Sequence, residues 1–491
     1  MEITKFFSEK SALNNHLRSL LIPLFLVVCF PSAQSQDWMQ LGNDIPGETV
    51  DDKSGASISL SEDGLTLAIG VPQHGSGNTG TVKVYTYSGT EWALKGNPIT
   101  GSSTDRYFGI SVSLSNDGNR LAVCAAYNNT NPNEEVKTYQ WNGSAWEQLG
   151  NTLLWQSLSV YHGSVKLNGS GDTVAIGDMG NTTNGNNAGQ IRIYTLNGNT
   201  WQQRGSSING SANDVTGEIL DLSNDGNTFA ANFGDNIQVY SWNGTDWTAK
   251  GNLFNEFPYQ TVALGQDGNI LVLTGLNAPG ANENKGAAQV YEWDGSIWTP
   301  KGPLFEGEPN SGLGFSAALN QNNNVLALGG PGANSGYGEA RTYIFNGTQW
   351  EQIGNTIVGE TDLEYCGFSI SLNGAGNILA VGSPTYLAGN YGLSARTRVF
   401  GNDDILSTQT EKSFILKSYP NPTRGSFSIL LDKTYSEVLI TVHNTLGQVL
   451  SENKYEATNH ITHKITGAAG VYLVRVNTAG EGSTILRIIK Q

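Results

Sequence analysis

Alternating apolar and polar residues recur along the chain in short segments separated by tight turns. Residues 82–96 read Val-Lys-Val-Tyr-Thr-Tyr-Ser-Gly-Thr-Glu-Trp-Ala-Leu-Lys-Gly, and residues 237–251 repeat the same plan. This alternation is typical of β-strands with one buried face. The Ser-Gly and Asn-Gly pairs at the bend supply the positive φ that a two-residue hairpin turn requires. Each segment therefore predicts a β-hairpin whose second strand begins with Trp and is followed by Gly.

This hairpin recurs at intervals of 46 to 55 residues. Its Trp and Gly occur at Trp38/Gly42, Trp92/Gly96, Trp146/Gly150, Trp201/Gly205, Trp247/Gly251, Trp298/Gly302 and Trp350/Gly354. A second hairpin lies between successive Trp residues, most clearly at residues 109–123 around the turn Asp117-Gly118. Four strands in a repeat of this length are the sequence signature of a β-propeller blade.

The two ends of the repeat array complement each other. The Trp38 strand has no preceding partner strands, and the strand at residues 397–400 has no following Trp strand. An open solenoid would leave both ends to be capped, whereas ring closure removes the exposed edges. We therefore predict an all-β fold, in which residues 36–401 form a seven-bladed β-propeller closed by the N-terminal strand.

The predicted topology places two kinds of connection on opposite faces. The two hairpin turns of each unit are tight and define a tight-turn face, while the other connections are long, vary between repeats and define a long-loop face. Variable loops on a rigid scaffold often carry ligand sites. We therefore predict a ligand site on the long-loop face near the central channel, although loops that bind nothing specific remain the alternative. The candidate residues are Asp51, Asp52, Asp105, Glu306, Glu308, Glu360, Asp362 and Glu364.

Several short motifs resemble the FG-GAP repeats of integrin-α-type propellers. They are Phe108-Gly109-Ile110-Ser111, Gly70-Val71-Pro72 and Gly330-Pro331. That family often has a calcium loop between the first two strands of a blade, but here the loop is shortened to residues 115–118. Only Asp221 and Asp225 keep two carboxylates at a suitable spacing, and Ca²⁺ needs six or more oxygen ligands. We therefore expect no cofactor and no metal, with Ca²⁺ the alternative left open.

The segments outside the repeats predict export. Residues 1–35 have a basic start, an apolar run of 11 residues from Leu20 to Phe30 and small residues before Gln36, as in a secretory signal peptide. Eleven residues are too few to span a membrane, so we expect no transmembrane segment. Residues 402–412 are polar and predict a linker. Residues 413–491 contain several short strand patterns and predict a small β-sandwich.

Residues 413–491 closely resemble the C-terminal sorting domain of the type IX secretion system of Bacteroidetes. The resemblance rests on Tyr419-Pro420-Asn421-Pro422 with Gly425, on Leu446-Gly447-Gln448, on Gly470-Val471-Tyr472 and on the basic end at Lys490. It implies the type IX machinery as a partner and a secreted or outer-surface location in a Gram-negative bacterium, after cleavage of the signal peptide.

Composition narrows the function. Residues 36–412 hold 16 basic and 36 acidic residues, a net charge of −20, so we expect no nucleic-acid partner. The sequence contains no catalytic His/Cys cluster, nucleophile elbow or phosphate loop. Enzyme activity therefore stays open, but its absence is favoured. We predict a non-enzymatic binding or adhesion protein for a glycan or protein ligand. The alternative is a secreted polysaccharide hydrolase that uses two carboxylates. Most Trp residues fit the core, but Trp141, Trp242 and Trp293 occur in only three repeats and are candidate exceptions.

Overall fold

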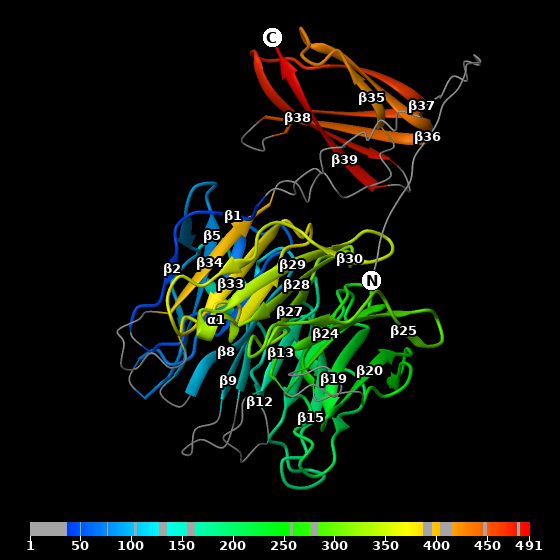
Figure 1. Cartoon of the computed structure of the whole chain (residues 1–491). Helices are drawn as coiled ribbons and strands as arrows, with labels where there is room; N and C mark the ends of the chain where they lie inside the picture. Colours follow the sequence, from blue (N-terminus) through cyan, green and yellow to red (C-terminus); the bar gives the residue numbers. More distant parts are fainter. Residues whose placement is uncertain are drawn as a thin grey trace, which may run out of the picture. The chain divides into compact units, whose positions relative to one another are not determined.

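The structure is a computed structural model of the whole chain (Figure 1). It describes residues 37–491, with the exception of residues 50, 76, 103–105, 127–134, 155–162, 256–258, 276–282, 386–394, 403–414, 445–448 and 479–481. Strands dominate the described residues, and the single helical element among them is the short turn α1 (Ala333–Gly336). The predicted signal peptide lies outside the described residues, and the domain boundaries at residues 35, 401 and 412 stay predictions.

The described residues of the repeat region form seven antiparallel sheets, which we call blades 1 to 7. Blades 1 to 3 consist of β3 (Ser57–Leu60), β4 (Thr66–Val71), β5 (Thr81–Tyr87), β6 (Trp92–Leu94) and β7 (Ile99–Thr100); β8 (Arg106–Leu114), β9 (Arg120–Ala126), β10 (Glu135–Trp141), β11 (Trp146–Gln148) and β12 (Leu153–Leu154); β13 (Ser164–Leu167), β14 (Thr173–Asp178), β15 (Gln190–Asn197), β16 (Thr200–Gln203) and β17 (Ile208–Asn209).

Blades 4 to 6 follow the same plan. They consist of β18 (Leu220–Leu222), β19 (Thr228–Phe233), β20 (Asn236–Trp242) and β21 (Trp247–Ala249); β22 (Tyr259–Leu264), β23 (Ile270–Gly275), β24 (Ala287–Trp293), β25 (Trp298–Pro300) and β26 (Phe305–Glu306); β27 (Ser316–Leu319), β28 (Val325–Gly330), β29 (Glu339–Phe345), β30 (Trp350–Gln352) and β31 (Ile357–Val358).

Blade 7 combines the two ends of the repeat region. It contains β32 (Ser369–Leu372), β33 (Ile378–Ser383) and β34 (Arg396–Gly401), together with the N-terminal strands β1 (Met39–Gln40) and β2 (Ile45–Pro46). Met39 pairs with Gly401, and Ile45 pairs with Thr397. The predicted closure by the N-terminal strand is therefore confirmed.

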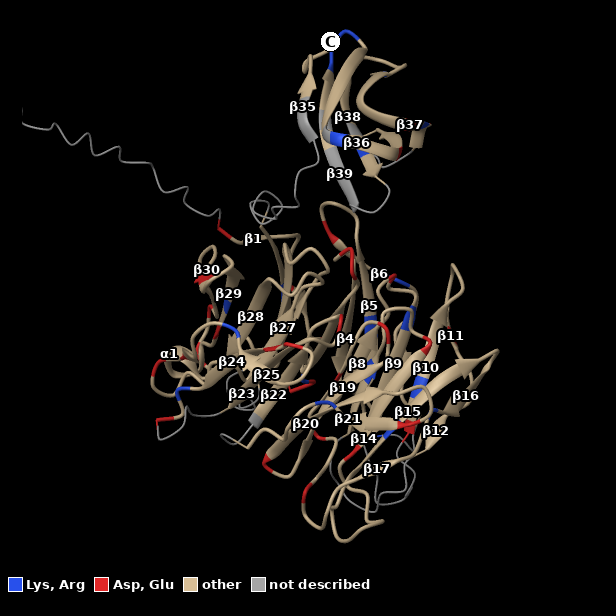
Figure 2. Cartoon of the chain, turned by 90° about the vertical axis from the view of Figure 1, so that its right-hand side faces the viewer, with Lys and Arg blue, Asp and Glu red and all other residues tan. Residues whose placement is uncertain are grey.

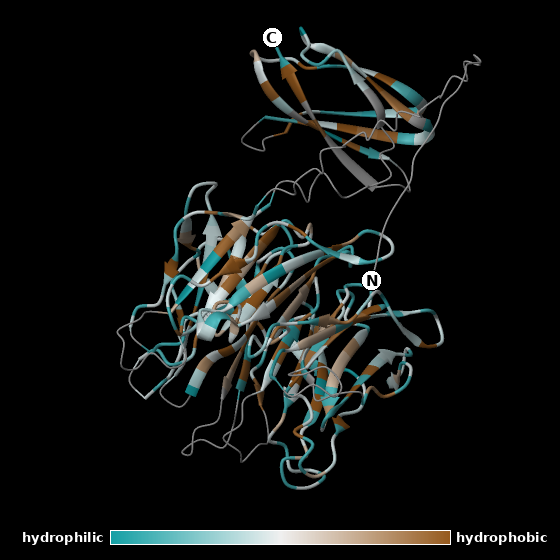
Figure 3. Ribbon diagram, viewed as in Figure 1, coloured by the Kyte–Doolittle hydropathy of each residue, from teal (hydrophilic) through white to brown (hydrophobic). Residues whose placement is uncertain are grey.

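The innermost strands of neighbouring blades contact one another around a central axis. The contacts run in the order β3, β8, β13, β18, β22, β27 and β32, and β32 in turn contacts β3. Apolar residues of the strands fill the space between adjacent blades, as in the cluster of Leu67, Ile69 and Val399 at the blade 7/blade 1 junction. Figure 3 shows the resulting mixture of hydrophobic and hydrophilic residues along the strands. The propeller prediction is confirmed.

Each repeated Trp links its blade to the preceding blade. The indole Nε1 of Trp92 donates to the carbonyl of Leu41 at 3.0 Å, and that of Trp38 donates to the hydroxyl of Thr342 at 2.7 Å. The other acceptors are the carbonyls of Lys95 for Trp146, Arg204 for Trp247, Lys250 for Trp298 and Lys301 for Trp350, and the Thr138 hydroxyl for Trp201. Burial of an indole requires such a partner for its N–H group.

The three exceptional tryptophans have a structural role. A cation of the preceding blade lies over each: Lys95 over Trp141 at 5.7 Å, Arg204 over Trp242 at 4.5 Å and Lys250 over Trp293 at 5.5 Å. Where the preceding blade has Leu149 instead of a cation, the next blade has Leu196 instead of Trp. The irregular occurrence of these Trp residues therefore reflects cation–π pairing between blades.

Hydrogen bonds also connect the first hairpin turns around the tight-turn face. The amide of Glu62 donates to the carbonyl of Asn116 at 2.8 Å, and the amide of Asn116 donates to Gly169 at 2.8 Å. The series continues from Gly169 to Asn224, from Asn224 to Gln266, from Gln266 to the side chain of Asn323, from Gln321 to Gly374 and from Gly374 to Glu62. Each blade is thus tied to the next at this end of the channel.

The C-terminal part has five described strands around its own core. They are β35 (Ile415–Tyr419), β36 (Ser426–His443), β37 (Val449–Lys464), β38 (Gly470–Thr478) and β39 (Gly482–Lys490). The core contains Phe427, Val438, Ile461 and Tyr472. Two of these strands, β36 and β37, are longer than the short segments that the sequence predicted, and they pair on both sides of a register shift between Leu430 and Tyr435.

Candidate functional site

The central channel widens into a cavity of about 590 Å³ on the long-loop face. Its lining includes residues from all seven innermost strands, such as Ser57, Val112, Lys166 and Ser369. A further space of about 160 Å³ lies deeper along the same strands, toward the tight-turn face. The channel therefore offers its larger opening to a ligand on the long-loop face, where the sequence predicted a site.

One repeat position forms the mouth of this cavity. It comes directly before the position that Ser57 occupies in blade 1, and in blade order its residues are Ala56, Ile110, Gly163, Glu218, Gln260, Phe315 and Phe368. All of these except Gly163 line the cavity. The rings of Phe315 and Phe368 lie 4.8 Å apart. The mouth therefore has an apolar half, from blades 6, 7, 1 and 2, and a polar half with Glu218 and Gln260.

Glu218, Phe315 and Phe368 were not among the site residues predicted from the sequence. The neighbouring repeat positions are occupied by Gly, Ser or aliphatic residues in most blades, because they build the scaffold. The mouth position differs in chemical type from blade to blade. The signal in the sequence was this variation: an alignment of the seven repeats would have shown one position that does not repeat.

The deeper channel residues are held by hydrogen bonds between blades. The hydroxyls of Ser59, Ser113 and Ser371 each accept the amide of a Leu in a neighbouring innermost strand at 3.0 Å. Asp221 takes the same role, because its Oδ2 accepts the amide of Leu264 at 2.8 Å. Its Oδ1 lies 3.4 Å from Lys166 Nζ. The charge of Asp221 is therefore balanced within the channel.

Glu218 differs from Asp221 in having no ion pair among the described residues. Glu218 is exposed at the mouth, but partial desolvation by the surrounding protein raises the pKa of its carboxyl above the ordinary value, and no nearby cation opposes this effect. Among the described residues that line the two channel cavities, the charged ones are Glu218, Lys166 and Asp221. The mouth therefore carries one carboxylate that the fold does not neutralise.

The predicted candidates Asp52 and Glu364 are buried and organise their own loops. Asp52 accepts the amides of Glu48 at 2.7 Å and Ser54 at 2.9 Å, and its side chain is inaccessible to solvent. Glu364 accepts the amide of Glu360 at 2.6 Å and is 1% exposed. Both carboxylates satisfy backbone donors at the entrance to an innermost strand, which gives them a local structural role.

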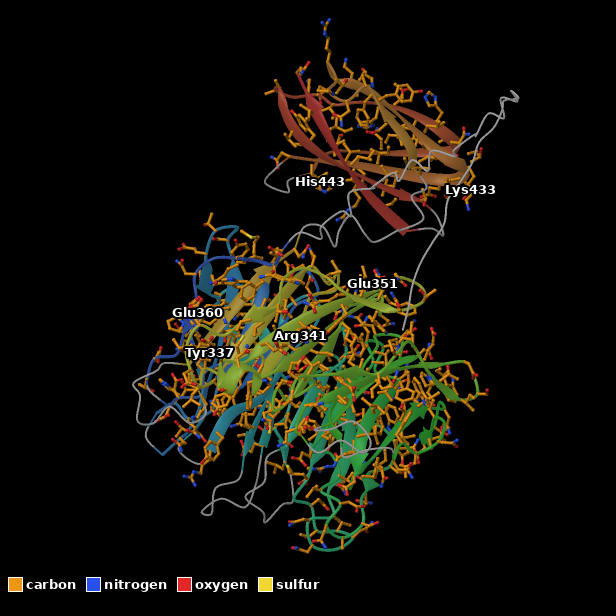
Figure 4. The ribbon with its side chains drawn as sticks, in the orientation of Figure 1. Tyr337, Arg341, Glu351, Glu360, Lys433 and His443 are labelled. Atoms are coloured by element: carbon orange, nitrogen blue, oxygen red, sulfur yellow. The ribbon has the colours of Figure 1, made fainter. Side chains whose placement is uncertain are left out.

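Glu360 and Glu364 are brought together by two arginines of β34. Arg396 lies 2.6 Å from Glu364, 2.9 Å from Glu360 and 2.8 Å from Asp44, while Arg398 lies 3.2 Å from Glu364. Burial alone would raise the pKa of Glu364, but the hydrogen bonds and charges of the arginines outweigh it and lower the pKa. This seam network joins the N-terminal segment to blade 7 and to the loop after β31, where Figure 4 labels Glu360.

The remaining candidates do not belong to the seam network. Asp51 lies 3.7 Å from Lys53. Glu306 in β26 is exposed, as are Glu308 and Asp362 on their loops and many acidic residues of the propeller (Figure 2). Asp105 lies outside the described residues. None of the seven described candidates lines the channel cavities, so the structure does not gather them into one site.

A second cavity, of about 420 Å³, lies at the seam between blade 7 and blade 1. Asp44, Glu48, Lys83, Tyr85 and Trp92 contribute to its lining. Lys83 Nζ lies 2.6 Å from Glu48 Oε1, and burial together with the charge of Glu48 raises the pKa of Tyr85 to about 12. Glu48 therefore interacts with both Lys83 and Tyr85 in this cavity.

The two carboxylates considered for calcium do not form one site. Asp221 faces the channel, whereas Asp225 accepts hydrogen bonds from Ser223 at 2.6 Å and from the Asn227 amide at 2.9 Å within its own turn. Within the described residues, no group of three or more His, Cys, Asp or Glu side chains is arranged to hold a metal ion.

The motif residues of the C-terminal part meet at one end of its sheet. Asn421 Oδ1 accepts the amide of Ile489 at 2.8 Å, and the amide of Thr423 donates to the Ile489 carbonyl at 2.8 Å. Gly425 bonds to Ile465, the Tyr472 hydroxyl donates to Ala468, and Lys490 donates to Gly467. Tyr419, Pro420 and Pro422 are exposed, and Gly470 begins β38. Gly447 lies outside the described residues.

Comparison with known families identifies this C-terminal part. Residues 417–491 match the secretion system C-terminal sorting domain. The predicted sorting domain is therefore confirmed, and it implies secretion through the type IX machinery to the cell surface or the surroundings. No curated protein matches the chain. The structure shows no helix, in the part that it describes, of the length and apolarity needed to cross a membrane.

Several solved structures are similar to this chain at low sequence identity. A chain of a mitotic checkpoint complex has a TM-score of 0.50 and 11% identity, covering 79% of this chain and 99% of that chain. The WD40 repeats of RRP9 have a TM-score of 0.49 and 10% identity, covering 74% and 99%. Hydrazine synthase of Kuenenia stuttgartiensis has a TM-score of 0.47 and 14% identity, covering 71% and 96%. At these identities the likeness concerns the fold alone.

Proposed function

We propose, from the sorting domain at residues 417–491, that this secreted protein is a non-enzymatic binding module, with its ligand site at the mouth of the central channel. The observation that carries the proposal is the set of residues at the mouth position. Six of its residues line a cavity of about 590 Å³, a size typical of ligand pockets. Their chemical type varies between blades while the surrounding scaffold positions repeat. Ligand binding is a physical reason for such variation on a repetitive scaffold.

A polysaccharide hydrolase is the competing function, and it needs two available carboxylates on either side of the scissile bond. Among the described channel residues, the carboxylates are Glu218 and Asp221. Asp221 is ion-paired with Lys166 and accepts the Leu264 amide, so each of its two oxygens already has a partner. This arrangement favours binding over hydrolysis.

A panel of glycans and peptides, applied to the secreted protein, tests the proposal. The expected result is saturable binding that the Phe315→Ala/Phe368→Ala double variant weakens at least tenfold. A matched double variant at exposed residues of the outer hairpins, Leu94→Ala/Ile297→Ala, should leave binding unchanged. Released product from any glycan would refute the non-enzymatic function, and binding that ignores the Phe variants would refute the site.

Export has its own test. The sorting-domain match predicts that the domain is removed from the mature protein, with a new C-terminus between residues 401 and 417. Mass spectrometry of surface-released protein measures this directly. Mature protein that keeps Gln491 would contradict the predicted processing, without bearing on the channel site.

A further inference from the structure

The channel mouth combines a carboxylate without an ion pair and an apolar wall. Lys166 and Asp221 balance each other deeper in the channel, so Glu218 leaves the described lining with a net charge of −1. Phe315 and Phe368 lie on the apolar half of the same mouth. A cation would be attracted by this charge, and an anion would be repelled by it.

An alkylammonium or guanidinium group fits both halves of the mouth. Aromatic faces attract a cation through their quadrupole, and a carboxylate forms a charge-assisted hydrogen bond with the same group. The aliphatic stem of a Lys or Arg side chain can in addition cover apolar surface while its charged end reaches the carboxylate. The same pairing of a cation with aromatic rings already occurs within this propeller, where Arg204 lies over Trp242 and Trp247.

The repeat scaffold does not require the carboxylate of Glu218. The other six blades place uncharged residues at the mouth position, so an acidic side chain is not needed there for folding. Glu218 is exposed at the mouth, and the surrounding protein still desolvates its carboxyl enough to raise the pKa. Carboxyls with perturbed pKa values are often found at functional sites.

The charge of the propeller together with its linker acts in the same direction. These residues, 36–412, carry a net charge of −20, and Asp and Glu are common on the loops (Figure 2). A surface of this sign raises the local concentration of cationic partners and accelerates their encounter with the mouth.

We infer that the channel mouth binds a lysine or arginine side chain presented by a peptide segment of a partner protein, with Glu218 as the counter-ion and Phe315 and Phe368 as the aromatic wall. The inference rests on the proposed function and specifies its ligand class. The cavity volume of about 590 Å³ suits one such side chain with part of its flanking backbone.

Fluorescence anisotropy with labelled peptides tests the inference on the secreted protein. The peptides share one neutral sequence and differ only in a central Lys, Arg, norleucine or Glu. The Lys and Arg peptides should bind at least tenfold more tightly than the norleucine peptide, and the Glu peptide should bind most weakly. Equal affinities for Lys and norleucine would overturn the inference.

Matched variants separate the mouth from the general charge of the surface. Glu218→Gln should abolish the preference for Lys over norleucine, whereas Glu308→Gln, on an exposed loop outside the cavity, should preserve it. Equal losses in both variants would show that only the overall field acts, and would overturn the inference. Lys166→Met leaves Asp221 without its ion pair and should increase the affinity for the Lys peptide. A melting temperature of Glu218→Gln no lower than that of the parent confirms that folding is intact.

The pH dependence gives a second readout. Lys166 and Asp221 are the other charged groups that the described residues place in the channel. As the pH falls through the raised pKa of Glu218, its carboxyl becomes neutral while the peptide lysine stays charged, so affinity should fall. Glu218→Gln should remove this dependence. If glycans bind in a Phe315-dependent manner but cationic peptides do not, the inference fails and the proposed function stands; if neither class binds the channel, both fail.

Discussion

The indole Nε1 of Trp38 donates a hydrogen bond to the hydroxyl of Thr342, across 304 positions of sequence. The backbone amide of Trp38 also donates to Asn355 Oδ1 at 2.7 Å, and the side chain is 4% exposed. Trp201 and Thr138 form the equivalent bond at 2.8 Å, between two blades that follow each other in the chain. The two pairs have the same chemistry. They differ in that the blades of Trp201 and Thr138 are consecutive in sequence, whereas Trp38 and Thr342 come from near opposite ends of the repeat region.

Trp38→Phe should therefore affect the seam more than Trp201→Phe affects its own junction. Each change leaves a Thr hydroxyl without its indole donor and creates a small void, at a cost of about 1–3 kcal/mol. In the Trp38 variant, the amides of Leu41 and Gly47, which donate to Val399 and Ala395, should also exchange faster with solvent. Hydrogen exchange measures this, and unchanged protection of both amides would contradict the assigned role of Trp38.

The cation–π links between blades should be measurable as coupling energies. Lys250 lies 5.5 Å from the Trp293 ring centroid, and we expect a coupling of about 0.5–2 kcal/mol in a double-mutant cycle with Lys250→Leu and Trp293→Leu. The double variant reproduces the natural pair Leu149 and Leu196. Additive effects of the two substitutions on the free energy of unfolding would show that the ring and the cation do not interact.

Close contact between blades should make Gly70 intolerant of a side chain. A Cβ at Gly70 would lie 2.0 Å from the carbonyl oxygen of Gly109 in the next blade, and backbone cannot move aside easily. Gly70→Ala should cost about 3 kcal/mol or more, at the upper end of overpacking effects. Gly401→Ala is the control, because its Cβ would meet only side-chain atoms of Leu41, the nearest at 3.1 Å. Denaturant unfolding compares them, and equal losses would contradict the contact argument.

The seam network should make stability depend on acidic pH. The pKa of Glu364 is lower in the folded chain than in the unfolded chain, so its ionised form stabilises the fold above the unfolded value of about 4.3. This contribution is lost as the pH falls through the lowered pKa. Glu364→Gln should cost about 3 kcal/mol at pH 7, because Arg396 and Arg398 lose a buried partner.

Unfolding free energies of the Glu364→Gln variant should also vary less between pH 5 and pH 3 than those of the parent protein. Glu308→Gln, at an exposed loop residue, should change neither the stability at pH 7 nor its pH dependence. A parent protein whose stability is flat over this range would show that the network does not contribute.

Features with a local or repeating signal could be predicted from the sequence. Asn-Gly and Asp-Gly turns mark the hairpins, and the isolated Trp38 strand indicated ring closure because it lacked neighbours of its own. The Tyr419-Pro420-Asn421-Pro422 motif marked the sorting domain. These signals arise from backbone geometry at a few adjacent residues, so they can be read without knowledge of tertiary contacts.

Features that depend on contacts between blades could not be predicted in the same way. The composition of the loops does not distinguish a carboxylate that caps backbone amides, such as Asp52, from one that meets a ligand. Lys95 and Trp141 meet only because adjacent blades pack, and no local pattern connects them. Glu218, Phe315 and Phe368 belong to one site because seven strand ends converge on an axis, which becomes apparent only when the ring is closed.

The pairing of β1 with β34 also orders events in time. During synthesis β1 precedes its partner β34 by about 360 residues, so β1 stays unpaired until the repeat region is complete. Uncovered strand edges promote association between chains. Ring closure therefore requires the first strand of the propeller to pair with its last strand. A chain that ends before residue 396 would lack the partner of its first strand.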